Sequence, residues 1–139
     1  MIFQKGRFDY RYLKGLPKEV KEASRINLSE YNSKDWYLSV WNIVNVLPVE
    51  GRLEEGIAAF PEEIPARLIK LFTFVGETVL DPFLGSGTTS KMAKELGRNS
   101  IGYEVDLELK PTILKKLGYA HDTFSEDRIE LLERSDAKR

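Results

Sequence analysis

Residues 78–97 combine a short strand, a turn with two glycines and a helix, and this combination restricts the folds open to the chain. The run TVLDPF (78–83) is rich in apolar residues, which predicts a short buried strand. The run GSGTTSKMAKELG then begins with glycines and ends at Gly97, a residue type that commonly terminates helices. A strand that passes through a glycine turn into a helix is typical of open α/β sheets, which bind ligands at the carboxyl ends of their strands.

The flanking segments extend this alternation in both directions. Residues 60–73 place apolar side chains at helical spacing, and residues 107–117 predict another helix that Gly118 ends. The runs SIGYEV (100–105) and RIELLE (128–133) predict two further strands. Because the connections are short, we expect parallel strands with right-handed crossovers. The predicted fold class is therefore α/β, with three parallel strands and flanking helices that form half of a Rossmann-like, doubly wound sheet.

The N-terminal part has a different character. Pro17 opens an amphipathic stretch to residue 28 that predicts a helix of about three turns, and the aromatic and β-branched run at 36–44 predicts one or two strands. Pro48, Gly51 and Gly56 mark a loop over residues 48–60. We therefore divide the chain into an N-terminal helix and strand segment, 1–59, and a ligand-binding half domain, 60–139.

Composition excludes several kinds of site. The 139 residues contain no cysteine and a single histidine, His121 in a polar stretch, so we expect no thiolate chemistry and no metal centre. No apolar run approaches the roughly 20 residues that a membrane span needs, and the first residues lack the apolar core of a secretory signal. We therefore expect a cytosolic protein with no membrane contact.

The glycine turn carries the candidate chemistry. Gly85 and Gly87 let the backbone approach a ligand closely, and the N–H groups of residues 86–89 lie at a helix N-terminus, where an anionic group is favoured. Glu104 closes the next predicted strand, where a carboxylate can accept both hydroxyls of a ribose. The alternative is that the glycines only form a tight turn between strand and helix.

Three nucleotide-like ligands could use such a turn. A phosphate-binding P-loop needs Gly-Lys-Ser/Thr, which does not occur in the sequence. A dinucleotide fingerprint needs a third glycine where Ser90 stands, and Asp81 would repel its phosphates. S-adenosylmethionine carries a sulfonium and an ammonium group, which favour Asp81, and a carboxylate, which suits the helix N-terminus. Charge therefore favours S-adenosylmethionine as the cofactor.

DPFLGSGTT, preceded by FPEEIPARLIKLFTFVGETVL and followed by GRNSIGYEVD, resembles the DNA methyltransferases that modify cytosine N4 or adenine N6. The similarity is to their circularly permuted (beta) group, in which the cofactor-binding half follows the catalytic half, and it covers residues 60–106 most closely. It implies an S-adenosylmethionine-dependent enzyme of DNA methylation and restriction-modification. The cofactor-binding residues that it implies are Phe60, Pro61, Asp81, Phe83, Gly85, Ser86, Gly87, Thr88, Thr89, Glu104 and Asp136.

The motif that performs methyl transfer in this family is missing. The family uses Ser, Asp or Asn followed by Pro-Pro and an aromatic residue to hold the amino group of a flipped base. This chain contains no Pro-Pro pair, so we assign it no catalytic residue. In addition, the strand at 78–83 would have one unpaired apolar edge, which favours pairing with another chain.

We therefore hypothesise a split methyltransferase in which this chain binds the cofactor, and a second chain, or a further copy in a homo-oligomer, completes the sheet. The absent half would set the acceptor base, for which we favour cytosine N4 over adenine N6, and the resemblance favours DNA as the substrate. Two alternatives are a non-catalytic regulatory or remnant module that binds S-adenosylmethionine, and a methyltransferase for small molecules.

A basic row offers one possible contact with DNA. Lys14, Lys18, Lys21 and Arg25 follow helical spacing, so they would form one narrow stripe that can meet phosphates. A solvated helix face is the alternative interpretation.

Overall fold

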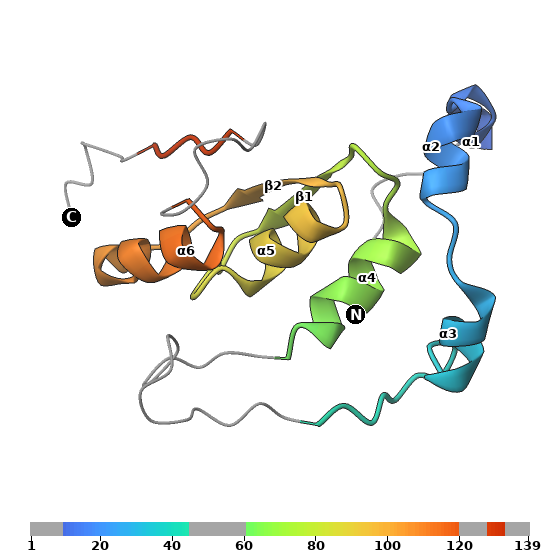
Figure 1. Ribbon diagram of the computed structural model, residues 1–139, viewed down its shortest axis with the longest axis horizontal. Coiled ribbons are helices and arrows are strands. Elements are labelled where there is room, and N and C mark those ends of the chain that lie inside the picture. The colour runs from blue at the N-terminus through green and yellow to red at the C-terminus, as the bar shows by residue number, and fades with distance from the viewer. Residues whose placement is uncertain (1–9, 45–60, 120–127, 133–139) are drawn as a thin grey trace.

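The computed structural model describes residues 10–44, 61–119 and 128–132 (Figure 1). Its sheet has two parallel strands, β1 (Thr78–Asp81) and β2 (Asn99–Gly102), with Asp81 opposite Gly102 at the carboxyl end. Helix α5 (Thr88–Glu95) connects them. The predicted α/β class and the order strand, glycine turn, helix, strand are therefore confirmed.

Two helices stack on one face of this sheet. Helix α4 (Glu63–Phe72), predicted from its apolar spacing, packs against α5, and α5 packs against both strands. The small core consists of Ile69 from α4 with Met92 and Ala93 from α5, and Val79 of β1 packs against it. Alternation along β1 explains this arrangement, because every second side chain points to the same face.

The opposite face of the sheet carries exposed apolar side chains. Leu80 and Ile101 are register partners on neighbouring strands and are 61% and 51% exposed. The prediction that strand β1 is buried is therefore wrong, since only one of its faces is covered. The strand is also shorter than the predicted 78–83, because it ends at Asp81. Exposed apolar area of this kind is typical of a surface that another structural element covers.

The end of the described chain differs in part from the prediction. The helix expected over 107–117 is present as the 3-10 turn η1 (Leu107–Leu109) followed by α6 (Lys110–Lys116). Residues 128–132, expected as a third strand, join no ladder, so that prediction is wrong for the residues described. Leu131 and Leu132 are 50% and 86% exposed there, so little burial drives this segment onto the edge of β2.

The N-terminal part forms three short helices instead of one longer helix. They are α1 (Tyr10–Gly15), α2 (Lys18–Ala23) and α3 (Leu28–Ser33), so the expected helix of three turns is too long. Asn27 explains the break after α2, because its side chain accepts hydrogen bonds from the N–H groups of Ser29 and Glu30 and thereby starts a new helix.

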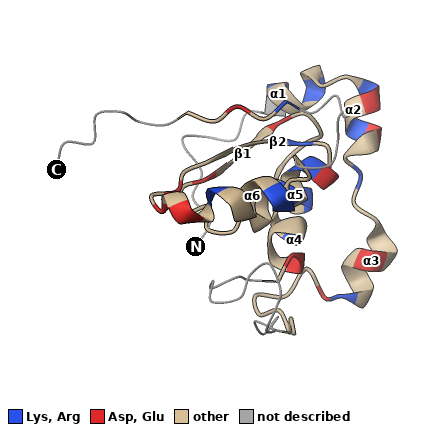
Figure 2. Ribbon diagram, turned by 60° about the vertical axis from the view of Figure 1, so that its left-hand side comes forward, with Lys and Arg blue, Asp and Glu red and all other residues tan. Residues whose placement is uncertain are grey.

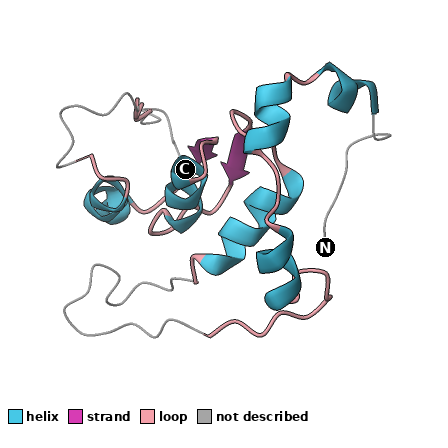
Figure 3. Cartoon of the chain, turned by 45° about the vertical axis from the view of Figure 1, so that its right-hand side comes forward, coloured by secondary structure: helices cyan, strands magenta, loops and turns pink. Residues whose placement is uncertain are grey.

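The strand predicted over residues 36–44 is also wrong. Turns and loop take its place, as Figure 3 shows, although the composition favours a strand. Trp36 is buried here by packing edge-on against Tyr31 and under the guanidinium of Arg67, so its burial comes from side-chain contacts. Aromatic residues occur both in strands and in buried loops, so composition alone led to the wrong prediction.

The N-terminal helices contact α4 directly. Lys70 of α4 forms an ion pair with Glu30 at 3.2 Å, and Arg67 donates a hydrogen bond to the backbone oxygen of Lys34 at 3.1 Å. The N–H of Val75 donates to the hydroxyl of Ser24 at 2.8 Å. The proposed boundary at 48–60 lies outside the described residues, and the division into two domains stays a prediction. Within the described ranges no helix is long and apolar enough to span a membrane.

Candidate functional site

The turn between β1 and α5 is fixed to the end of β2 by backbone hydrogen bonds. The N–H of Leu84 donates to the backbone oxygen of Tyr103 at 2.9 Å, and the N–H of Gly85 donates to the Glu104 carboxylate at 2.8 Å. The Leu84 side chain also lies directly over Gly102, where an added Cβ would come within 2.7 Å of it. The glycine turn is therefore held in one position by the strand beside it.

Both glycines of the turn adopt conformations that favour glycine. Gly85 has φ of 55° and Gly87 has φ of 88°, in the left-handed region. Gly87 is the N-cap residue of α5 and brings no side chain to cap the first N–H groups of that helix. Gly87 is itself buried, and an added Cβ there would lie 3.5 Å from the side chain of Ile113 in α6, so the approach of a ligand to this helix N-terminus stays a prediction.

Glu104 lies beside this turn and holds two segments together. One carboxylate oxygen accepts from Gly85, and the other accepts from the N–H groups of Val105 and Asp106 at 2.7 and 2.9 Å. The N–H of Asp106, followed by those of Gly85 and Val105, lowers the pKa of Glu104, against a smaller opposing effect of burial. Since each carboxylate oxygen can accept two hydrogen bonds, the group still has capacity for a ligand hydroxyl.

Asp81 lies at the carboxyl end of β1. Its side chain accepts a hydrogen bond from the N–H of Phe83 at 3.0 Å, which shapes the start of the turn, and its backbone oxygen accepts from Tyr103 at 3.0 Å. The Phe83 ring is 86% exposed at the same end of the sheet. A carboxylate and an exposed ring therefore occur together at the place where ligands bind in open α/β sheets.

The hydroxyls of the turn face inward. Ser86 and Thr88 are both buried, and each accepts a hydrogen bond at 2.8 Å from the ammonium group of Lys116 in α6. Burial lowers the pKa of Lys116. The sequence offers no signal for this contact, because Lys116 is 30 residues from Ser86 and looks like one of several helix lysines.

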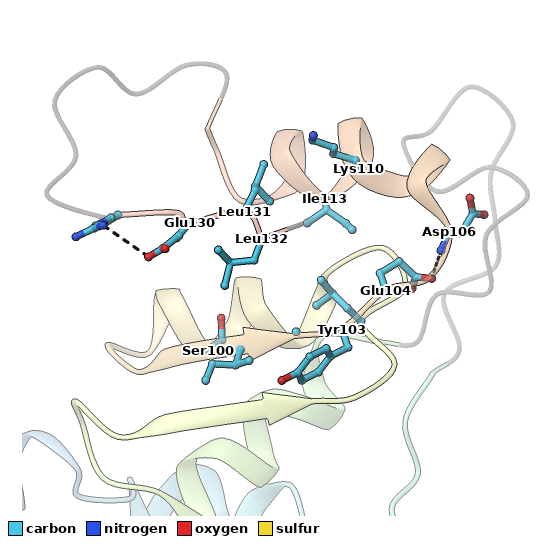
Figure 4. Close-up of a pocket in the computed structure, with 13 residues that line it drawn as sticks. Ser100, Tyr103, Glu104, Asp106, Lys110, Ile113, Glu130, Leu131 and Leu132 are labelled. Carbon is cyan, nitrogen blue, oxygen red and sulfur yellow. Dashed lines mark hydrogen bonds and ion pairs between the residues drawn. The ribbon is translucent and has the colours of Figure 1, made fainter. Parts of the chain in front are cut away.

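A cavity of about 610 Å³ opens beside the carboxyl end of β2 (Figure 4). Glu104 and Asp106 line it from the segment after β2, Ile113 from α6, and Glu130, Leu131 and Leu132 from the opposite side. This volume is in the range of small-molecule sites. Of the predicted cofactor residues it includes Glu104, whereas Asp81 and the glycines lie outside its lining.

The other predicted site residues are partly accounted for. Pro61 is buried immediately before α4, and Thr89 lies half-buried in the first turn of α5. Glu62 and Lys91 form an ion pair at 2.6 Å that connects these two helices. Phe60, Asp136 and His121 lie outside the described residues. No cluster of histidine and acidic side chains that could hold a metal ion occurs in the ranges the structure describes.

The basic row does not form the single stripe that the sequence predicts. Lys14 belongs to α1, Lys18 and Lys21 belong to α2, and Arg25 follows that helix, so the four charges lie on two helices and a turn. Figure 2 shows this basic region apart from the basic residues of α5 and α6. Lys21 donates to the backbone oxygen of Lys14, and Arg25 pairs with Glu22 at 3.3 Å. The assumption of one continuous helix was wrong because Gly15 ends α1 and Pro17 precedes α2.

The fold and the site together define a class: α/β proteins that bind a ligand at a glycine turn between a first strand and its helix, beside an acidic residue that follows the second strand. A family model described as DNA methylase (N6_N4_Mtase) matches residues 1–115. The chain therefore belongs to this DNA methylase family.

Individual relatives agree with this assignment. The chain is 46% identical over 111 residues to the type II methyltransferase M.MjaI of Methanocaldococcus jannaschii, an alignment that covers 77% of this chain and 37% of that protein. It is 41% identical over 87 residues to M.MthZI of Methanothermobacter thermautotrophicus, covering 59% of this chain and 24% of that protein. The match thus spans well under half the length of each of these relatives.

Solved structures show the same similarity. TTHA0409 of Thermus thermophilus matches with a TM-score of 0.61 and 27% identity, covering 86% of this chain and 42% of that one. The structure of TTHA0409 complexed with S-adenosyl-L-methionine matches with a TM-score of 0.58 and 26% identity, covering 81% and 40% of the two chains.

Proposed function

We propose that this chain is the S-adenosylmethionine-binding part of a DNA amino-methyltransferase of the permuted group. The observation that carries the proposal is the attachment of the glycine turn to Glu104, because it brings a helix N-terminus and a carboxylate together at one end of the sheet, and we propose that this carboxylate binds the ribose. The complex of TTHA0409 with S-adenosyl-L-methionine supports this choice of cofactor. The three-stranded, Rossmann-like half and the division at residue 60 belong to this proposal.

Charge assigns the parts of the cofactor to the site. The methionine carboxylate suits the N–H groups at the start of α5, and a ribose hydroxyl suits the Glu104 oxygen that accepts from Gly85, which has one further acceptor position. Asp81 attracts the ammonium and sulfonium groups. Phe60, Pro61, Phe83 and Asp136 complete the proposed site from the methionine and adenine ends.

Calorimetric titration of the full chain with S-adenosylmethionine tests this proposal. We expect a one-to-one complex and competition by S-adenosylhomocysteine, because both ligands share the ribose and the carboxylate. GTP serves as the matched control, since its phosphates would meet Asp81. No heat of binding, or equal affinity for GTP, would contradict the proposed site.

The catalytic half of the enzyme is proposed to lie on a second chain. The chain contains no Pro-Pro pair. The exposed pair Leu80 and Ile101 and the outer edge of β1 supply an apolar surface that the missing half would cover. In the assembled enzyme, a base extruded from DNA would present its amino group in line with the sulfonium methyl, and the protein would contribute orientation and exclusion of water.

We expect the chain alone to transfer no methyl group to duplex DNA. The reason is that none of its residues matches the group that holds the target amine in this family. The measurement is incorporation of labelled methyl groups into mixed-sequence DNA, with a complete methyltransferase of the family as the positive control. Robust incorporation by the purified chain would remove the split-enzyme proposal, whereas the cofactor site would be unaffected.

Substrate contacts form the last part of the proposal. The acceptor is cytosine N4 or adenine N6, with cytosine favoured, and Lys14, Lys18, Lys21 and Arg25 are candidate contacts to DNA phosphates. Contacts with phosphates release counterions, so we expect a sequence-independent and salt-sensitive contribution from these side chains. Arg25 would exchange its exposed pair with Glu22 for such a contact.

A further inference from the structure

Lys116 connects the last turn of α6 to the two buried hydroxyls of the glycine turn. Its ammonium group lies 2.8 Å from the hydroxyl oxygens of both Ser86 and Thr88, and those oxygens lie 3.4 Å from each other. Ser86 is 4% exposed and Thr88 is 3% exposed. One ammonium group therefore holds both polar side chains of this turn from the protein interior.

The direction of these hydrogen bonds has an electrostatic consequence. An ammonium group only donates, so both hydroxyl oxygens act as acceptors toward Lys116. Because the two hydroxyls are neutral, they do not cancel the positive charge of Lys116. Burial strengthens the electric field of this charge, since solvent screens it less. Lys116 thus adds positive potential at the turn from which α5 begins.

The packing beside Lys116 makes this arrangement rigid. Ile113, one turn earlier in α6, is buried and lies next to Gly87, where an added Cβ would come within 3.5 Å of its side chain. Helix α6 therefore contacts the turn at two points, through an apolar side chain at Gly87 and through the ammonium group at Ser86 and Thr88.

We infer that Lys116 is a positioning residue: it holds the glycine turn in place and makes the potential there more positive, which favours binding of the carboxylate group of the ligand. The inference rests on the proposed function, because it assumes that S-adenosylmethionine binds at this turn. It adds a residue from α6 to the site and assigns it to one end of the cofactor. Lys116 acts through the turn and its potential, whereas Glu104 acts on the ribose.

The test compares two ligands that differ only in the carboxylate, S-adenosylmethionine and its decarboxylated form, on the full chain. In Lys116→Met we expect the affinity for S-adenosylmethionine to fall about tenfold, the size of one charge-assisted interaction, while the decarboxylated form changes less than twofold. Lys116→Arg should regain most of the lost affinity. Lys115→Met is the matched control, since Lys115 is an exposed neighbour in the same helix, and it should change neither affinity.

The outcomes separate this inference from the proposed function. Equal loss of affinity for both ligands in Lys116→Met would show a general structural role and overturn the inference, as would no loss at all. If that variant does not fold, Thr88→Val removes one hydroxyl partner and should show the same preference for the decarboxylated ligand; equal affinities there would also overturn it. Failure of the unmodified chain to bind either ligand would instead contradict the cofactor site itself.

Discussion

Replacing Glu104 by alanine is expected to weaken the binding of S-adenosylmethionine by about 1.5–3 kcal/mol, or roughly ten- to more than a hundredfold in affinity. The carboxylate accepts three backbone N–H groups, one from the glycine turn and two from the residues that follow it. Its loss would remove the proposed ribose contact and also release Gly85 from its position. Calorimetry on the variant and the unmodified chain measures the difference.

A matched control separates loss of the ligand contact from the loss of one negative charge on the chain. Glu108→Ala removes an exposed carboxylate four residues away, in η1, and should leave the affinity within a factor of two. Asp81→Ala should weaken binding in the same range as Glu104→Ala, because it removes the charge proposed to attract the ammonium and sulfonium groups. Unchanged affinity in both Asp81→Ala and Glu104→Ala would place the cofactor elsewhere.

Replacing Arg67 by alanine is expected to lower the free energy of unfolding by about 2–3 kcal/mol, without any direct contact to the ligand site. The Arg67 guanidinium is buried, pairs with Glu63 at 2.6 Å and lies 5.6 and 5.0 Å from the ring centres of Trp36 and Trp41. It also holds the backbone of Lys34. Removing it breaks the hydrogen bond between α4 and the backbone of Lys34 and takes away the cation packed against the two tryptophan rings.

Urea titration followed by tryptophan fluorescence measures this effect, since both tryptophans contact Arg67. The control is Arg25→Ala, whose side chain is 76% exposed and pairs only at the surface with Glu22, so its unfolding free energy should change by less than about 0.5 kcal/mol. A similarly small change in Arg67→Ala would show that the N-terminal segment contributes little to the stability of the fold.

The local features of the site could be predicted because their signals lie within a few residues of one another. The glycine turn at 85 and 87, the apolar spacing of α4 and an acidic residue near the end of the second strand are all visible in the sequence. The structure has positive φ at both glycines, and β2 ends at Gly102, so Glu104 follows the strand instead of closing it. These elements follow from backbone sterics and helical periodicity, which act over short distances along the chain.

The features that the sequence did not predict depend on contacts between distant residues. A strand needs a neighbouring edge, so the apolar residues of 36–44 and 128–132 were insufficient to make either segment part of the sheet. Lys116 and Arg67 were not recognised because their partners lie across the fold, 28 to 33 residues away along the chain for the contacts with Thr88 and Lys34.

The parallel register of β1 and β2 has a consequence for how the site tolerates change. Asp81 is opposite Gly102, so main-chain pairing brings the turn after one strand level with Glu104 after the other. A shift of one residue in the register of β2 against β1 would turn Ile101 toward α5 and move the side chains that follow it to the other face of the sheet. Insertions or deletions within either strand should therefore be far more harmful than substitutions of its exposed side chains.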